Sequence, residues 1–345
     1  MEKTRLGRTD LMVSRTSFGA LPIQRITVDE STKILRKAYE AGINFFDTAR
    51  SYTNSEEKIG YALSDVRENI IIATKSQARN REELEKHLST SLKNLRTDYI
   101  DILQFHNPSF MPIPGEENGL YDAIVQAKEK GFIRYIGITN HRLDLTKRAI
   151  ESGLYDTVQF PLSSISSQED LNLVKECRDN DIGLIAMKAL SGGLINNAAS
   201  TFAFLRQYEN LVPIWGIQRE WELDEFLSFE DKPPKLDKDM WKIIEKDRED
   251  LGGSFCRSCG YCMPCSVDIP IPNAARMSLL LTRSPYERYM TDEWRRDMDK
   301  INDCTQCGLC KTKCPYGLDI PNLLQSMLEN YDEFYSNYKA GNLDK

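Results

Sequence analysis

The chain has 345 residues, a length that favours two domains or one barrel with an appendage. Hydrophobic residues make up 41% and charged residues 28%, a balance typical of globular proteins that argues against disorder. The formal net charge is −7 with no basic block, so we expect neither a nucleic-acid nor a membrane partner. No apolar run approaches the roughly 20 residues that span a bilayer, and no signal-peptide core follows Met1. We therefore expect a cytoplasmic protein.

Eight short apolar runs alternate with helix-like stretches over residues 1–230. Each run is rich in Ile, Val, Phe or Tyr and is short enough to be a buried strand. The runs lie at 16–21, 44–48, 70–75, 99–106, 133–139, 157–162, 183–188 and 212–217. Apolar residues at helical spacing lie between them, such as Leu84, Leu88 and Leu92. Strands that alternate with helices indicate parallel β-α units, so we predict an α/β fold, a (β/α)8 TIM barrel.

An open, doubly wound sheet is the alternative architecture for the same alternation. Such a sheet usually carries a Gly-x-Gly-x-x-Gly turn after its first strand. The segment at the first apolar run reads Phe18-Gly19-Ala20-Leu21-Pro22 and does not match that turn. The number and spacing of the runs therefore favour the closed barrel.

Polar residues close several of the apolar runs. Asp47 lies one residue before the end of the second run, Lys75 ends the third and His106 the fourth, while Asn140 follows the fifth and Gln159 lies within the sixth. A single residue of this kind is most simply a polar strand end that faces solvent. In such barrels, however, the chemistry sits at the carboxyl ends of the strands. An Asp, a Lys and a His on three successive strands therefore predict a catalytic site.

Ordered motifs along residues 4–228 carry a family resemblance. The motifs are Leu6-Gly7-Arg8-Thr9 with Val13-Ser14, Phe45-Phe46-Asp47-Thr48-Ala49 with Tyr52, Ser55-Glu56 with Ile59-Gly60, Ala73-Thr74-Lys75, Leu103-Gln104-Phe105-His106, Gly137-Ile138-Thr139-Asn140, and Pro213-Ile214-Trp215-Gly216-Ile217. With them, this part of the chain resembles the aldo-keto reductase family. The resemblance implies a catalytic tetrad of Asp47, Tyr52, Lys75 and His106, acting on a small-molecule carbonyl or alcohol.

The chemistry of carbonyl reduction suits these residue types. It needs a hydride donor on one face of the carbonyl and a proton donor at its oxygen. A free tyrosine has a pKa of about 10 and is a weak acid at neutral pH. A lysine ammonium near Tyr52 would lower that pKa, and Asp47 would hold Lys75 in place. His106 would orient the substrate oxygen by a hydrogen bond.

The resemblance also implies a nicotinamide dinucleotide, NADP(H) or NAD(H), across the mouth of the barrel. The residues implied to bind it are Asp47, Thr139, Asn140, Gln159, Met187, Leu190, Gly192, Gly216, Gln218 and Arg219. Among them, Thr139, Asn140 and Gln159 match positions that hold the carboxamide. Leu190 and Gly192 match the loop over the pyrophosphate.

Two residues depart from the family pattern. Met187 stands where many members place an aromatic ring against the nicotinamide, although a thioether can also pack on a flat ring. Glu222 stands where many members carry a basic residue near the adenosine phosphate. Its charge disfavours a 2′-phosphate, which Arg219 could offset, so the choice between NADPH and NADH stays open.

The rest of the chain forms a different module. Residues 231–252 are charged, contain Pro233-Pro234 and end in a Gly-Gly pair that extends to Gly253, so we predict a linker with one short helix at 240–250. We assign residues 1–230 to the barrel and 253–345 to a second domain. The tail after Asn330 looks helical, and we expect it to dock on the barrel or on a second subunit of a homodimer.

Eight of the nine cysteines lie in two short groups. They are Cys256, Cys259, Cys262 and Cys265, then Cys304, Cys307, Cys310 and Cys314. The second group has the spacing of bacterial ferredoxins and is followed by proline, whereas the first ends in a shorter gap and is followed by Ser266. Both groups contain Cys-Gly-x-Cys and lead into Asp-Ile-Pro. We therefore predict two 4Fe–4S clusters.

Three other arrangements are open to these cysteines. Disulfides are not favoured in a reducing compartment. Two zinc sites are disfavoured because zinc ribbons hold two cysteine pairs apart rather than four cysteines close together. A single cluster on the second group, with a degenerate first group, stays open because of the shorter gap. The ninth cysteine, Cys177, lies on a predicted helix and is expected to be a buried apolar residue.

The segment between the two cysteine groups is long and looks helical. In this respect the module resembles the α-helical ferredoxin domain. That resemblance implies ligand sets that cross over between the groups. One cluster would take Cys256, Cys259, Cys262 and Cys314, and the other would take Cys304, Cys307, Cys310 and Cys265.

The two modules use different units of electron transfer. Nicotinamide chemistry moves two electrons as a hydride and each cluster passes one, so direct exchange normally needs a flavin, for which the chain has no motif. The favoured hypothesis is an oxidoreductase whose clusters relay electrons to a redox partner protein. The alternatives are an electron-transfer protein with flavin at the barrel, and a carbonyl reductase with structural or sensing clusters. The tetrad disfavours the former, and the presence of two clusters disfavours a purely structural role.

Overall fold

The computed structural model describes residues 1–252 and 255–341, and the chain divides into two compact units. The first unit holds Met1–Ala189 and Ala198–Ile244, and the second holds Leu190–Asn197 and Glu245–Lys345. This division differs from the predicted boundaries, because Leu190–Asn197 groups with the C-terminal part of the chain. Residues 253–254 and 342–345, which belong to the predicted second domain, lie outside the described residues.

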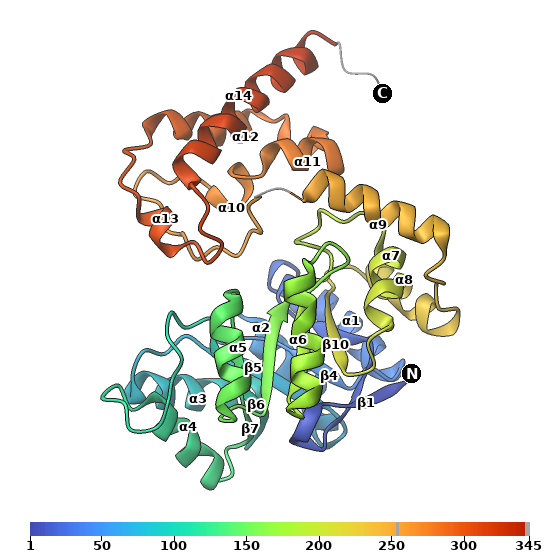
Figure 1. The fold of residues 1–345 in the computed structure, drawn as a ribbon, viewed down its shortest axis with the longest axis vertical. Helices are drawn as coiled ribbons and strands as arrows, with labels where there is room; N and C mark the ends of the chain where they lie inside the picture. Colours follow the sequence, from blue (N-terminus) through green and yellow to red (C-terminus); the bar gives the residue numbers. More distant parts are fainter. Residues whose placement is uncertain (253–254, 342–345) are drawn as a thin grey trace. The chain divides into compact units, whose positions relative to one another are not determined.

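The first unit is a closed barrel of eight parallel strands, with helices around its outside (Figure 1). The strands are β3 (Ser17–Gly19), β4 (Phe45–Asp47), β5 (Ile71–Ser76), β6 (Ile100–His106), β7 (Ile133–Thr139), β8 (Thr157–Pro161), β9 (Gly183–Met187) and β10 (Leu211–Gly216). The helices are α1 (Val28–Glu40), α2 (Ser55–Leu63), α3 (Arg81–Leu95), α4 (Leu120–Glu129), α5 (Leu143–Ser152), α6 (Gln168–Asp179), α7 (Ala198–Arg206) and α8 (Glu220–Asp231). Each predicted apolar run overlaps one strand, so the predicted barrel is confirmed.

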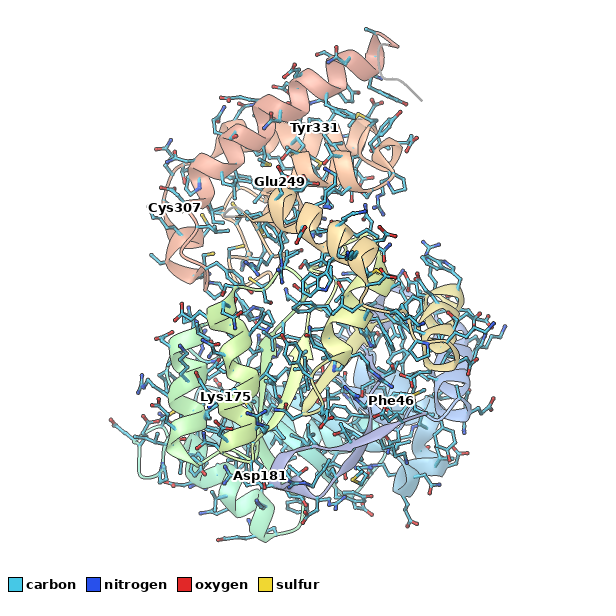
Figure 2. The ribbon with its side chains drawn as sticks, turned by 45° about the vertical axis from the view of Figure 1, so that its right-hand side comes forward. Phe46, Lys175, Asp181, Glu249, Cys307 and Tyr331 are labelled. Atoms are coloured by element: carbon cyan, nitrogen blue, oxygen red, sulfur yellow. The ribbon has the colours of Figure 1, made fainter. Side chains whose placement is uncertain are left out.

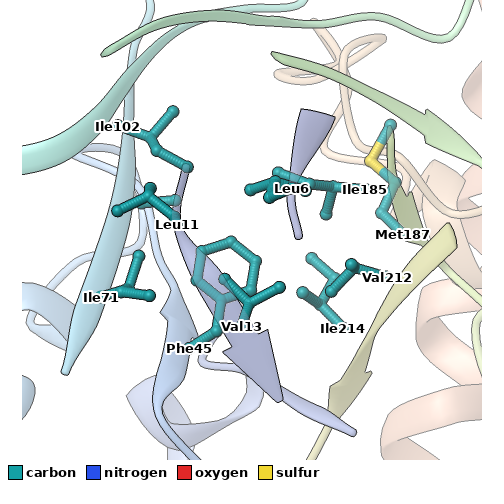
Figure 3. Packing of buried hydrophobic residues seen from close by; sticks show 11 residues of the cluster. Leu6, Leu11, Val13, Phe45, Ile71, Ile102, Ile185, Met187, Val212 and Ile214 are labelled. Carbon is teal, nitrogen blue, oxygen red and sulfur yellow. The ribbon is translucent and has the colours of Figure 1, made fainter. Parts of the chain in front are cut away.

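An N-terminal hairpin that the sequence analysis did not anticipate closes the end of the barrel where the strands begin. Strands β1 (Lys3–Arg5) and β2 (Met12–Ser14) pair antiparallel. Leu6, Leu11 and Val13 join the buried cluster inside the barrel (Figure 3). Gly7 has a φ of +53°, and a Cβ there would lie 2.1 Å from the Gly183 backbone nitrogen. Only glycine therefore allows the hairpin to approach β9 so closely.

The side chains that face the barrel interior change from apolar to polar along the strands. Alternate residues of a strand share one face, so residues two apart point the same way. The inward rows run from Phe45 to Asp47 on β4, from Ile71 to Lys75 on β5, and from Ile102 through Gln104 to His106 on β6. The apolar ends of these rows pack on the hairpin. Their polar ends therefore gather at the carboxyl end of the barrel.

The second unit is helical. Its helices are α9 (Lys238–Leu251), which begins in the first unit, α10 (Ile271–Ala274), α11 (Met277–Arg283), α12 (Asp292–Asp299), α13 (Leu309–Lys313) and α14 (Ile320–Lys339). The predicted linker thus carries a helix of 14 residues. Within the described residues, no helix is both long and apolar enough to cross a membrane.

Helix α14 forms the core of the second unit. Its buried Leu324, Leu328 and Tyr331 lie on one side of the helix, which contacts α10, α11, α12 and α13. The Tyr331 hydroxyl donates to the Tyr289 carbonyl oxygen at 2.7 Å, and Figure 2 labels this tyrosine on α14. The tail predicted to dock on the barrel or on a second subunit therefore buries its apolar side within its own unit.

Candidate functional site

A buried ion pair lies at the carboxyl ends of β4 and β5. The Lys75 Nζ donates to Asp47 Oδ1 at 2.5 Å and to the Thr48 carbonyl oxygen at 2.7 Å. The two charged side chains are only 1% and 3% exposed. Burial lowers the pKa of Lys75, and the neighbouring Asp47 carboxylate opposes that shift. Asp47 therefore holds the lysine in place and favours its charged form.

Tyr52 and His106 complete the predicted tetrad. The centroid of the half-buried Tyr52 ring lies 5.4 Å from Lys75 Nζ. The same ring meets the His106 ring edge-on, with the two centroids 5.8 Å apart. The four side chains come from three strand ends and the loop after β4, and the structure brings them together.

The loop that carries Tyr52 is held by short contacts. The Arg50 N–H donates to the Lys75 carbonyl oxygen at 2.9 Å, and the Ser55 N–H donates to the Tyr52 carbonyl oxygen at 2.8 Å. The Arg50 side chain pairs with Glu56, which is buried. Thr74 Oγ1 and Ser91 Oγ also donate to this carboxylate, at 2.7 and 2.6 Å. Glu56 is thus a fully bonded anchor for the loop.

His106 is held as a neutral imidazole. Burial and the positive charges of Lys75 and Lys188 lower its pKa to about 3. Its Nδ1 lies 3.4 Å from the Ser51 hydroxyl oxygen. A neutral imidazole carries one N–H, so His106 can donate a hydrogen bond to an oxygen without being an acid at neutral pH.

Gln104 is a site residue that the sequence analysis did not single out. It lies on β6 two residues before His106 and therefore on the same face of the strand. Its Nε2 donates to Asp47 Oδ2 at 3.3 Å and to Gln159 Oε1 at 2.9 Å. Its presence in the Leu103-Gln104-Phe105-His106 motif was the only signal in the sequence.

The residues predicted around the nicotinamide are buried at the ends of β7, β8 and β9. The Thr139 hydroxyl donates to the Met187 sulfur at 3.7 Å. The Asn140 side chain is used by the protein itself, because its Nδ2 donates to the Pro108 carbonyl oxygen at 3.0 Å and its Oδ1 accepts from the His141 N–H at 2.9 Å. Asn140 therefore braces the loops that follow β6 and β7.

The remaining predicted dinucleotide residues divide between the two units. Leu190 and Gly192 fall in the second unit, where Arg276 Nη1 donates to the Gly192 carbonyl oxygen at 2.9 Å. Gly216, Gln218 and Arg219 lie in the first unit, at the end of β10 and the start of α8.

The two cysteine groups share one backbone conformation. The residue before the second cysteine of each group is left-handed, with a φ of 51° at Ser258 and 52° at Gln306. The glycine that follows is also left-handed, with a φ of 80° at Gly260 and 73° at Gly308. Such turns direct backbone N–H groups into a concavity, as at iron–sulfur sites. The first group is therefore built like the second despite its shorter final gap.

Cysteines of the first group lie close to cysteines of the second group. A cavity of the second unit is lined by Cys262 and Cys265 of the first group together with Cys304, Cys307 and Cys310 of the second. Cys307 is exposed and is labelled in Figure 2.

Cys314 lies instead near the first group. Burial raises the pKa of Cys256, an effect opposed by the Ser258 N–H and Arg276 and increased by the nearby thiols of Cys259 and Cys314. In the described residues, no group of three or more His, Cys, Asp or Glu converges on a single-ion position. Thiolates around a wider cavity fit a four-iron cluster, whose irons each take one cysteine.

Comparison with known proteins agrees with this architecture. Residues 16–210 match the aldo/keto reductase family, and residues 255–319 match the 4Fe–4S dicluster domain. The chain belongs to the aldo/keto reductase family and carries a 4Fe–4S dicluster domain after its barrel. It is thus an oxidoreductase, as predicted.

Relatives of known sequence cover the barrel. L-galactose dehydrogenase of Arabidopsis thaliana is 30% identical over 214 residues, and the match covers 56% of this chain and 67% of that one. Aldo-keto reductase YhdN of Bacillus subtilis is 30% identical over 216 residues, covering 56% of this chain and 64% of that one.

Solved structures share the fold of the barrel. Aldo-keto reductase AKR11C1 from Bacillus halodurans, in its holo form, has a TM-score of 0.61 and 21% identity, covering 72% of this chain and 96% of that one. An aldo-keto reductase from Klebsiella pneumoniae in complex with NADPH has a TM-score of 0.61 and 17% identity, covering 71% and 94%.

Proposed function

We propose that the barrel interconverts a small carbonyl compound and its alcohol with NAD(P)H, using Tyr52 as the proton donor and acceptor. The observation that carries this proposal is the buried Lys75–Asp47 ion pair beside the Tyr52 ring. A positive charge next to a phenol favours the phenolate and makes the phenol a stronger acid. No simple packing role requires a lysine and an aspartate in this nearly inaccessible place.

Lys75, Tyr52 and His106 have different roles in the reduction. Lys75 has three N–H groups, of which Asp47 and the Thr48 carbonyl oxygen take two, so one remains for the Tyr52 oxygen. Tyr52 gives its proton to the carbonyl oxygen of the substrate and then recovers a proton from water. His106 donates its N–H to the same oxygen and so orients the carbonyl.

The dinucleotide, when bound, supplies the hydride in reduction and accepts it in oxidation. We infer that Thr139 and Gln159 hold its carboxamide, since both are buried at the mouth of the barrel. Asn140 supports this place chiefly by bracing the neighbouring loops, because its oxygen already accepts backbone hydrogen bonds. Gln218 and Arg219 would lie along the adenosine end.

We further propose that two 4Fe–4S clusters relay electrons to a redox partner protein. The repeated left-handed turns and the crossed placement of Cys265 and Cys314 support two crossed ligand sets. The protein would hold these clusters in a reducing compartment, the cytoplasm, where thiolates are not lost to disulfides.

The experiment uses the full chain purified without oxygen. Tyr52→Phe removes only the ionisable hydroxyl, and Tyr61→Phe, on the exposed surface of α2, is the matched control. We expect Tyr52→Phe to lower kcat for NAD(P)H-dependent carbonyl reduction by roughly 10²- to 10⁴-fold, with unchanged dinucleotide affinity. Full activity in Tyr52→Phe would overturn the proposal. Iron, sulfide and flavin are quantified on the same sample, and stoichiometric flavin would favour the electron-transfer alternative.

A further inference from the structure

Gln104 occupies an unusual place for an amide. Its side chain has no exposed surface and lies inside the barrel. Both hydrogens of its amide nitrogen are used, one on Asp47 and the other on Gln159. The orientation of this amide is settled by chemistry, since the flipped form would set its oxygen against the Asp47 carboxylate.

The barrel wall is adapted to hold this side chain. Gln104 is in register with Lys75 on one side and with Gly137 on the other. A Cβ at position 137 would lie 2.9 Å from the Gln104 Cγ and 2.4 Å from the Thr157 hydroxyl. Glycine at this position therefore leaves the space that Gln104 fills.

The amide is retained although it is not fully satisfied. Gln104 Oε1 is buried and has no hydrogen-bond partner, and the same is true of Thr157 Oγ1. A buried polar atom without a partner costs about 1–3 kcal/mol. An apolar residue at position 104 would avoid that cost, so packing alone does not explain the glutamine.

We propose that Gln104 is a positioning residue that joins the Asp47–Lys75 pair to Gln159. The inference rests on the proposed function. Towards Asp47, Gln104 donates to the ionised carboxylate and so favours the form that pairs with Lys75. Gln104 thereby connects the Asp47–Lys75 pair, which lies beside the proton donor Tyr52, to Gln159 at the dinucleotide site.

The hydrogen bond from Gln104 to Gln159 also determines which atoms of the Gln159 amide remain available to a ligand. Because Gln159 Oε1 accepts from Gln104, its nitrogen must be the donor in its own hydrogen bond to Asp47. One N–H of Gln159 is then left, and it can bind only an acceptor, such as the carboxamide oxygen of a nicotinamide.

The test compares Gln104→Met with Thr157→Val in the anaerobically purified full chain. Met keeps the length of the side chain but removes both donors. Thr157 is the matched control because its hydroxyl also lies beside Gly137, is buried without a hydrogen-bond partner, and so forms no hydrogen bond to Asp47 or Gln159. Gln104→Glu is a second variant of nearly the same shape, which can donate only when protonated.

We expect Gln104→Met to lower kcat about 10- to 100-fold and to weaken NADH binding several-fold. It should also raise the pKa that governs the acid limb of the kcat profile. For Thr157→Val, we expect kcat and NADH affinity within about twofold of the wild type. Gln104→Glu should be most active at acid pH. Equal effects of Gln104→Met and Thr157→Val, or an unchanged acid limb, would overturn the proposal.

A measurement without turnover separates this proposal from the proposed function. The lost hydrogen bond is strongest while Asp47 is ionised, so the destabilisation by Gln104→Met in urea should grow as pH rises through the pKa of Asp47. The effect of Thr157→Val should not depend on pH. A wild type without carbonyl reductase activity would refute the proposed function, and the unfolding data would still decide whether Gln104 supports Asp47. A pH-independent effect of Gln104→Met would refute that support.

Discussion

Lys75 and Asp47 form a 2.5 Å ion pair in the interior of the barrel, and neither side chain is more than 3% exposed. Two charges removed from water are tolerated there because each is the partner of the other. The pair lies on adjacent strands at the carboxyl end of the barrel, beside the Tyr52 ring.

The first prediction concerns this ion pair. Lys75→Met leaves the Asp47 carboxylate buried and unpaired, so we expect a loss of about 3–5 kcal/mol of unfolding free energy along with catalytic activity. The double variant Asp47→Asn with Lys75→Met should lose less stability than the two single variants together, because it leaves no isolated charge. Urea unfolding measures this. Lys175→Met, in the exposed pair with Asp179, is the control and should change little. Strictly additive losses would contradict a coupled pair.

The second prediction concerns the charge of His106. With a pKa of about 3, the imidazole stays neutral above pH 5, so its contribution to the rate should not titrate between pH 5 and 9. His106→Ala should lower kcat about 10- to 100-fold without changing the shape of the pH profile over that range.

The lowered pKa of His106 also makes the stability of the folded protein depend on pH. The unfolded chain takes up a proton on this histidine at about pH 6.5, whereas the folded protein resists until about pH 3. Stability contributed by the neutral imidazole should therefore be lost as pH falls from about 6.5 towards 3, and His106→Ala should remove that part of the acid sensitivity. Chemical unfolding at pH 5 and 7.5 tests the sign. A kinetic pKa near 6.5 that disappears in the variant would show that His106 titrates normally.

The third prediction concerns the choice of dinucleotide. Glu222 Oε2 accepts from the Gln218 and Arg219 N–H groups at 2.7 and 2.8 Å, so these donors at the start of α8 already face a carboxylate. A 2′-phosphate at this end would meet like charge, and we expect the wild type to prefer NADH. Glu222→Ala should shift the ratio of NADPH to NADH affinity about tenfold towards NADPH, whereas Glu225→Ala on the same helix should not. A wild type that prefers NADPH would show that the adenosine phosphate lies elsewhere.

The fourth prediction tests the crossed cysteine sets. Two intact clusters correspond to about eight irons per chain. Cys256→Ser with Cys314→Ser should remove one cluster and leave about four irons, because both residues belong to one set. Cys310→Ser with Cys314→Ser should remove both clusters. Uncrossed sets would give the opposite pattern. Cys177→Ala, in the barrel, is the control and should keep all the iron.

Much of the fold was predictable because its signals are local. Each barrel strand is one short apolar run, and burial on both faces makes such runs visible without knowledge of their partners. The hairpin β1–β2 was missed because its strands are three residues each and its role depends on Leu6, Leu11 and Val13 meeting residues of distant strands. The direction of the α14 apolar side was likewise decided by its contacts with other helices.

The sequence by itself determined which chemical groups are present, including the tetrad residues and the two cysteine groups, because residue type and spacing along one strand or loop carry that information. Only the tertiary structure decided which groups meet. Gln104 reaches Asp47 and Gln159 from a third strand, and Cys262 and Cys265 line one cavity with Cys304, Cys307 and Cys310. Hydrogen bonds and ligand sets of this kind join residues far apart in the chain, so their geometry is fixed by strand register and helix packing rather than by local sequence.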